Sequence, residues 1–148
     1  MSKAVDLVVN PLDSDQQYVL YDNGLLRSTG NAPLPPVNPL RGVNAFGDTA
    51  RKLQVIDWNP PGSGYILTAL GRTLPYGSAI APGSTPVVGA SGAALYSAMS
   101  FAMHPDGNGQ GWILNSYGKL FKVLGPGDVD PPNMLAPSGG SNLGFGEN

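Results

Sequence analysis

Cysteine is absent from this 148-residue chain, and histidine occurs only once, at His104. Without cysteine there are no disulfides, no thiolate nucleophile and no cysteine-ligated zinc. A single histidine cannot build a multi-histidine metal site. Charged residues make up only 12% of the chain, and the formal net charge is -2 with the eight basic residues scattered. This charge pattern argues against a nucleic-acid binder, which needs a dense basic surface to displace counterions.

Residues that populate exposed helix faces are also scarce. Glutamate occurs once, at Glu147, and lysine four times, whereas 21 glycines and 15 prolines supply about a quarter of the chain. No apolar run approaches membrane-spanning length, and the N-terminal MSKAVDLVVNP lacks the apolar core of a signal peptide. We therefore expect a soluble all-β protein with no membrane insertion and no usual export leader.

The chain repeats one pattern three times. Similar segments open on Tyr18-Val19-Leu20, Tyr65-Ile66-Leu67 and Trp112-Ile113-Leu114, and each aromatic follows the previous one by 47 residues. A glycine stands six residues after each aromatic, at Gly24, Gly71 and Gly118. Matching positions at an equal period indicate three copies of one structural unit.

Each unit is predicted to form a small antiparallel sheet. A first strand such as AVDLVVN, KLQVIDWN or AMSFAMH ends near an X-Pro pair and a polar loop. The repeated aromatic opens the second strand, and the repeated glycine forms a tight turn that needs a positive φ. A third strand such as LLRST, RTLPY or KLFKV follows, and a fourth, outer strand could lie near residues 43–47 and 85–90.

The predicted organisation is one all-β repeat domain over residues 1–136, with units at about 4–47, 48–95 and 96–136. Residues 137–148, PSGGSNLGFGEN, show no periodicity and predict a flexible Gly/Ser/Asn-rich C-terminal tail. A unit of about 47 residues with three or four strands has the size of a β-propeller blade. We expect the repeated aromatics to pack between neighbouring units.

The runs NPPGSGYILTALGRTLPYG and HPDGNGQGWILNSYGKLF resemble bacterial β-propeller repeats of the type NPDGSGGYVLDGYGGIHPFG, and FGDTARKLQVIDWNP resembles the link that joins such blades. The resemblance covers about residues 4–125. Repeats of this kind occur in surface and secreted proteins of actinobacteria and in minor tail proteins of their phages. The resemblance therefore implies a propeller-type fold and specifies no biochemical activity. The acidic residue after the second strand of that repeat is kept only at Asp22.

Three units are fewer than the four to eight blades of a closed propeller. Two solutions stay open. Copies of the chain complete the ring, as a dimer with six blades would, or the three sheets close as a triangular prism within one chain. The prism is comparable to monocot-type mannose-binding lectins with their Q-x-D-x-N-x-V-x-Y sheets. Only the first unit keeps part of that motif, at Asp15, Val19 and Tyr21, so no sugar site of that kind is predicted.

Candidates for catalysis are few. Any Ser–His–Asp triad would need His104, which precedes Pro105 at a strand end where the other units have asparagine, so we interpret it as a turn residue. Two acid pairs lie in loops and recur at no common position across the units: Asp13 with Asp15, and Asp128 with Asp130. Such pairs favour solvated turns over catalytic carboxylates.

The run Asp106-Gly107-Asn108-Gly109 has the alternating oxygen ligands of a calcium loop. Asp-Gly and Asn-Gly are also hairpin-turn dipeptides, and the twelfth position, acidic in an EF-hand, is Tyr117. We favour the hairpin interpretation. The sequence predicts no catalytic residue, no metal site and no cofactor.

We expect a non-enzymatic structural virion protein, most specifically a phage minor tail or tail-tip subunit with an assembly or surface-binding role. It would be assembled in the host cytoplasm, form a homo-oligomer and contact other virion structural proteins. The alternative is a carbohydrate-binding, lectin-like β-repeat module for a host cell-surface glycan, with one weak site per unit. Its candidate sugar-stacking residues are Tyr21, Tyr76 and Tyr117.

Overall fold

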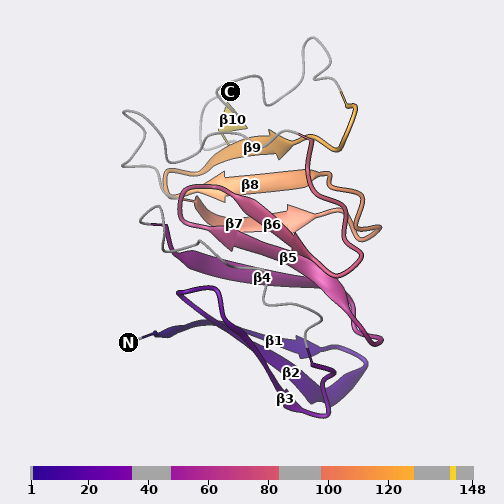
Figure 1. Ribbon diagram of the computed structural model, residues 1–148. Coiled ribbons are helices and arrows are strands. Elements are labelled where there is room, and N and C mark those ends of the chain that lie inside the picture. The colour runs from indigo at the N-terminus through magenta and orange to yellow at the C-terminus, as the bar shows by residue number, and fades with distance from the viewer. Residues whose placement is uncertain (1, 35–47, 84–97, 129–140, 143–148) are drawn as a thin grey trace.

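A computed structural model describes residues 2–34, 48–83, 98–128 and 141–142, whose strands form three antiparallel sheets (Figure 1). The first sheet contains β1 (Ala4–Asn10), β2 (Asp13–Tyr21) and β3 (Leu26–Gly30). The second contains β4 (Ala50–Asp57), β5 (Ser63–Thr68) and β6 (Thr73–Tyr76). The third contains β7 (Ala98–Met103), β8 (Gly111–Asn115) and β9 (Lys119–Val123), with β10 (Ser141–Asn142) beside β9. The predicted all-β class is confirmed, and none of these sheets is closed.

The repeat of the sequence is also a repeat of the strand pairing. The aromatics at Tyr18, Tyr65 and Trp112 pair with Val8, Gln54 and Ala102 of the preceding strands. The turns after β2, β5 and β8 place Gly24, Gly71 and Gly118 at φ angles of 90°, 90° and 83°. In each turn the glycine N–H donates to the carbonyl three residues earlier, at 2.8, 3.0 and 3.1 Å. Equivalent residues of the three sheets can therefore be compared directly.

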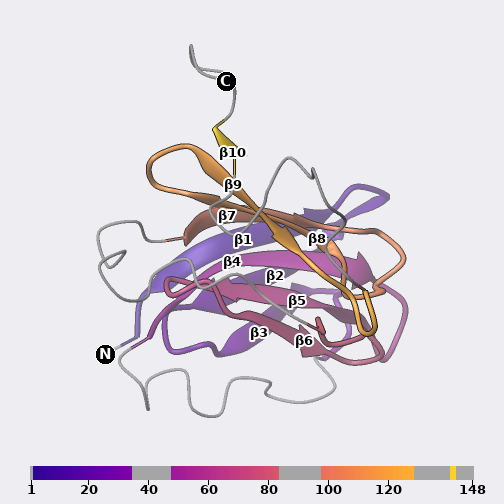
Figure 2. The same ribbon diagram turned by 90° about the horizontal axis from the view of Figure 1, so that it is seen from above.

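The three sheets stack face on face, with the second between the first and the third (Figure 1). Seen from above, β1, β4 and β7 lie over one another (Figure 2). Among the described strands, those of the first sheet contact only the second sheet, and those of the third contact only the second. The described strands thus form an open stack with two end faces.

Two apolar clusters hold the stack together. Between the first and second sheets lie Tyr18, Leu20 and Leu26 with Ala50, Leu53, Ile66 and Tyr76. Between the second and third sheets lie Tyr65 and Leu67 with Ala98, Met103, Ile113 and Val123. Successive side chains of a strand point to opposite faces. β5 therefore supplies Ile66 to one cluster and Tyr65 and Leu67 to the other, and all six of its residues are buried.

Strands β1–β9 lie between the bounds of the predicted units 4–47, 48–95 and 96–136, whereas β10 lies in the predicted tail. Of the predicted tail, 137–148, Ser141 pairs with Leu120 and Asn142 with Lys119, and its other residues lie outside the described part of the chain. The outer strands predicted near 43–47 and 85–90 also lie outside it. The described residues contain no helix of the length and apolarity needed to cross a membrane.

Gly77→Ala should destabilise the fold more than Gly127→Ala does. Both glycines have a positive φ, 65° and 80°, which costs an L-residue about 1–2 kcal/mol. A Cβ at Gly77 would also overlap the carbonyl oxygen of Gly62, whereas a Cβ at Gly127 meets nothing within 4 Å. We expect urea unfolding to show a loss of about 1–2 kcal/mol for Gly127→Ala and several times more for Gly77→Ala. Equal losses would contradict the close backbone approach.

Candidate functional site

The repeated tyrosines lie inside the stack and tie its parts together through their hydroxyl groups. The Tyr18 hydroxyl donates to the carbonyl of Pro33 at 2.7 Å. The Tyr65 hydroxyl donates to the carbonyl of Ile80 at 2.7 Å and accepts the N–H of Gly109, in the third sheet's loop, at 2.9 Å. Both rings are buried, as expected for residues that pack between units. Each tyrosine ring therefore packs between two sheets, and its hydroxyl group forms hydrogen bonds with backbone groups at the edge of that contact.

Trp112 occupies the same repeat position and is only half-buried. Its neighbour Ile113 packs toward the second sheet, so Trp112 lies on the opposite face of β8. Among the described strands no sheet follows the third, and this explains the difference from Tyr18 and Tyr65.

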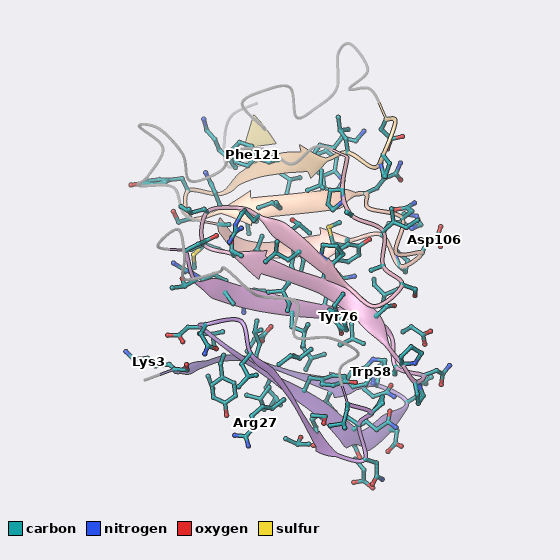
Figure 3. The ribbon with its side chains drawn as sticks, in the orientation of Figure 1. Lys3, Arg27, Trp58, Tyr76, Asp106 and Phe121 are labelled. Atoms are coloured by element: carbon teal, nitrogen blue, oxygen red, sulfur yellow. The ribbon has the colours of Figure 1, made fainter. Side chains whose placement is uncertain are left out.

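Aromatic residues also fill the contact between the first and second sheets. The rings of Tyr18 and Trp58 stack at 5.1 Å between centroids and 25° between planes. Figure 3 shows Trp58 and Tyr76 at this junction. The Tyr76 hydroxyl is buried and has no hydrogen-bond partner among the described residues. Burial raises the pKa of Tyr76 well above its ordinary value, and the charge on an ionised Tyr18 adds to the effect.

Two polar side chains fasten the first strands of successive sheets to each other. The Asp6 carboxylate accepts the N–H of Leu53 at 2.8 Å. The Gln54 side chain accepts the N–H of Met103 at 2.6 Å and donates to its carbonyl at 2.8 Å. Both side chains therefore pair with the backbone edge of the next sheet, which would otherwise carry unsatisfied polar groups.

Asp48 is a buried carboxylate that the sequence analysis did not single out. Its Oδ2 lies 3.1 Å from Nε of Arg72, and its Oδ1 accepts the N–H groups of Thr49 at 2.9 Å and Leu70 at 3.0 Å. The contacts with Leu70 and Arg72 fix the link before β4 to the turn after β5, so this ion pair is structural. The signal for it was the FGDTARK segment, whose aspartate stands at the start of a blade link.

His104 lies in a turn. Its Nδ1 accepts the N–H of Asp106 at 3.2 Å and lies 3.4 Å from the Asp106 carboxylate, with both side chains exposed. The sequence placed His104 at the position of an asparagine in each of the other two units. The strand pairing confirms this equivalence for Asn10 of the first unit but not for Asn59 of the second. Val55 of the second sheet is equivalent to Met103, so the counterpart of His104 is Ile56. The asparagine lies further along the connection from Val55 to its partner in β5, which is longer than the equivalent connections.

A hollow of about 240 Å³ adjoins His104. Its other lining residues are Ala102, Met103, Gln110, Gly111, Trp112, Lys122 and Val123. None of them carries a carboxylate or a hydroxyl, so the hollow brings together no Ser–His–Asp arrangement.

The loop from Asp106 to Gly109 docks onto the second sheet. The carbonyl of Gly107 accepts the N–H of Ile80 at 2.9 Å, and the N–H of Gly109 donates to Tyr65. Both glycines have a positive φ, 67° and 87°. The run that resembles a calcium loop is thus a turn whose backbone completes the contact around Tyr65.

The four acids weighed as catalytic pairs do not converge. Asp13 and Asp15 are exposed at the start of β2, where the Asp13 carboxylate accepts the N–H of Asp15 at 3.0 Å. Asp128 follows the third sheet, and a hydrogen bond from Gln110 holds the pKa of its carboxyl below the ordinary value. Asp130 lies outside the described residues. The described strands of the first and third sheets make no contact, so the two acids of β2 and Asp128 belong to separate parts of the stack.

The candidate sugar-stacking tyrosines occupy three different environments. Tyr117 is 63% exposed in the turn after β8, and Tyr21 is half-buried at the end of β2. Tyr76 is only 4% exposed and belongs to the core between the first two sheets. A glycan cannot reach Tyr76 unless the sheets separate.

Apolar side chains are exposed on both end faces of the stack. On the first sheet, Leu7 is 60% and Val9 43% exposed, and their cross-strand partners are the half-buried Val19 and Gln17; we call this the Leu7 face. On the third sheet, a hollow of about 160 Å³ is lined mainly by Ser100, Ala102, Trp112, Leu114 and Leu120; we call this the Trp112 face. Such apolar faces of a sheet are typical of interaction surfaces.

At neutral pH, Tyr65→Phe should lower the stability of the fold, whereas Tyr76→Phe should not. Phenylalanine at 65 leaves the Ile80 carbonyl and the Gly109 N–H without their partner, so we expect a loss of about 1–3 kcal/mol in urea unfolding. Phenylalanine at 76 removes a buried hydroxyl that has no partner among the described residues, so its stability should be unchanged or higher. Similar losses from both would contradict this assignment.

Alkaline pH should destabilise the protein partly through Tyr76. The folded state raises the pKa of this phenol, whereas the unfolded chain ionises it near its ordinary value of 10.0. The corresponding stability is therefore fully present below about pH 10 and is lost as the pH rises toward the folded pKa. Unfolding free energies measured from pH 9 upward should fall less steeply for Tyr76→Phe than for the wild type. Identical slopes would count against the raised pKa.

Comparisons of the chain with protein-family models, with curated proteins and with solved structures give no match. The described residues contain interlocked sheets and two apolar end faces. They contain no group of three His, Cys, Asp or Glu side chains that could hold a metal ion.

Proposed function

We propose that this chain is a non-enzymatic structural protein whose role is assembly with other subunits. The observation that carries the proposal is the open stack with an apolar face at each end. Inside the stack, the same kind of face is covered twice by a neighbouring sheet. The polar side chains that suggested chemistry are engaged in turns and in contacts between sheets.

The same proposal treats the three sheets as blades of a propeller-like assembly and not as a prism. A prism requires each sheet to meet both others. The described strands of the first and third sheets do not meet, and β1, β4 and β7 follow one another along one side of the stack. This arrangement favours continuation of the stack by further blades.

The most specific form of the proposal is a phage minor tail or tail-tip subunit that resides in the virion. It is supported by the resemblance of residues 4–125 to propeller repeats that occur in such tail proteins. Its partners would be other virion structural proteins and further copies of the chain.

A carbohydrate-binding module for a host cell-surface glycan is the second candidate, and the exposed ring of Tyr117 favours it. Burial of Tyr76 counts against one stacking site in every blade. A glycan array read with wild-type protein and with Tyr117→Ala tests this candidate, since specific binding should depend on that ring.

The virion assignment predicts that the chain is recovered with purified particles. Mass spectrometry of density-purified phage should detect it at a fixed ratio to the other tail proteins, and antibodies should label the tail in electron micrographs. A soluble host protein added before purification is the control for carry-over. Detection only in cytoplasmic fractions would overturn the virion role.

A further inference from the structure

We propose that the Trp112 face of one copy packs against the Leu7 face of a second copy, head to tail, and that two such contacts close a dimer. The proposal deepens the assembly role and rests on it, because it names a copy of this chain as the partner. The proposal follows from the repeat. The chain already makes the same sheet-to-sheet contact twice, and each end face corresponds to one side of that contact.

The Trp112 face is the third version of a face that is covered in the other two sheets. The leucines Leu20, Leu67 and Leu114 are equivalent, two residues after each repeated aromatic. Leu20 and Leu67 are completely buried against the next sheet, whereas Leu114 is half-buried. Leu114 therefore stands where a further sheet would cover it.

The Leu7 face is likewise the first version of a face that is covered in the other two sheets. Strand pairing makes Val19 equivalent to Ile66 and Ile113, which are both completely buried. Leu7 is equivalent to Leu53, and their exposed fractions are 60% and 6%. Arg27, at the edge of this face, points away from the second sheet (Figure 3). The three units thus have apolar residues at the same positions, but among the described strands no preceding sheet covers them in the first unit.

Three equivalent alanines stand at the start of the first strands, where backbone hydrogen bonds join successive sheets. Ala4, Ala50 and Ala98 pair with the last residues of the second strands. Ala50 donates its N–H to the Asp22 carbonyl of the preceding sheet at 2.8 Å, and Ala98 donates to the Ala69 carbonyl at 2.9 Å. Ala50 and Ala98 are buried, and Ala4 is exposed. In the proposed contact, Ala4 of one copy lies at the Ser116 turn of the other.

The polar differences at the end faces complement each other. Where the loop before β8 has Gly109, the first sheet has Asp15, whose carboxylate oxygens accept. Where the second sheet has Tyr65, the third has Trp112, whose indole nitrogen only donates. A donor on one face thus meets an acceptor on the other.

The number of blades fixes the size of the assembly. Rings of this architecture have four to eight blades, and six is the only multiple of three in that range. A head-to-tail contact that closes after two copies forms a ring, and one that does not close forms a filament. We therefore infer a dimer with six blades.

Light scattering after size exclusion tests the contact. The wild type should have about twice the chain mass of 15.3 kDa. Ala4→Arg alters only the Leu7 half of the contact and Leu114→Glu only the Trp112 half, so each variant alone should halve the mass. Their equimolar mixture should regain the dimer mass, because a mixed dimer keeps one unaltered contact. Leu12→Glu, at a 94% exposed loop position, is the matched control and should remain dimeric.

The mixture also controls for folding, since an unfolded variant cannot restore a dimer. A monomeric wild type, or variants that stay dimeric alone, would overturn the head-to-tail contact. A mixture that stays monomeric would do the same, and a mass that keeps rising with concentration would overturn closure at two copies. A monomer that is present in purified particles would remove this contact and leave the proposed virion role intact.

Discussion

Each sheet of this protein depends on its neighbour, because a sheet with an apolar face must bury that face against another element. The contact between successive sheets is therefore the interaction on which the rest of the structure depends. Both times it combines a tyrosine and a leucine from one sheet with an alanine and other apolar residues from the next. The backbone edges at this contact are satisfied by Asp6 and Gln54.

The period of 47 residues was readable in the sequence because local turn chemistry repeats with it. The glycine turns need a positive φ and the aromatics must fill the space between sheets, so both leave residues at fixed positions. These constraints were enough to predict the all-β class and three antiparallel sheets. The turn role of the loop at Gly109 also followed from its composition.

What the sequence could not show depends on residues that are distant along the chain. Nothing near Gln54 indicates that its amide pairs with the backbone of Met103, and nothing near Asp48 points to Arg72. Tyr21, Tyr76 and Tyr117 are alike in sequence, and only the packing of the sheets separates a core ring from an exposed one. The misplaced asparagine match at His104 has the same origin, because a longer connection shifts the register without changing the local motif.

The complete burial of β5 has a consequence for the number of repeats. In a linear array whose units contact only their neighbours, stability is a sum of unit terms and interface terms. Three is the smallest number that gives one unit an interface on both sides. The middle sheet belongs to both clusters, so loss of that sheet would separate the chain into two units without a shared core. In an isolated copy, folding should therefore be cooperative through the centre, while the two outer sheets open first.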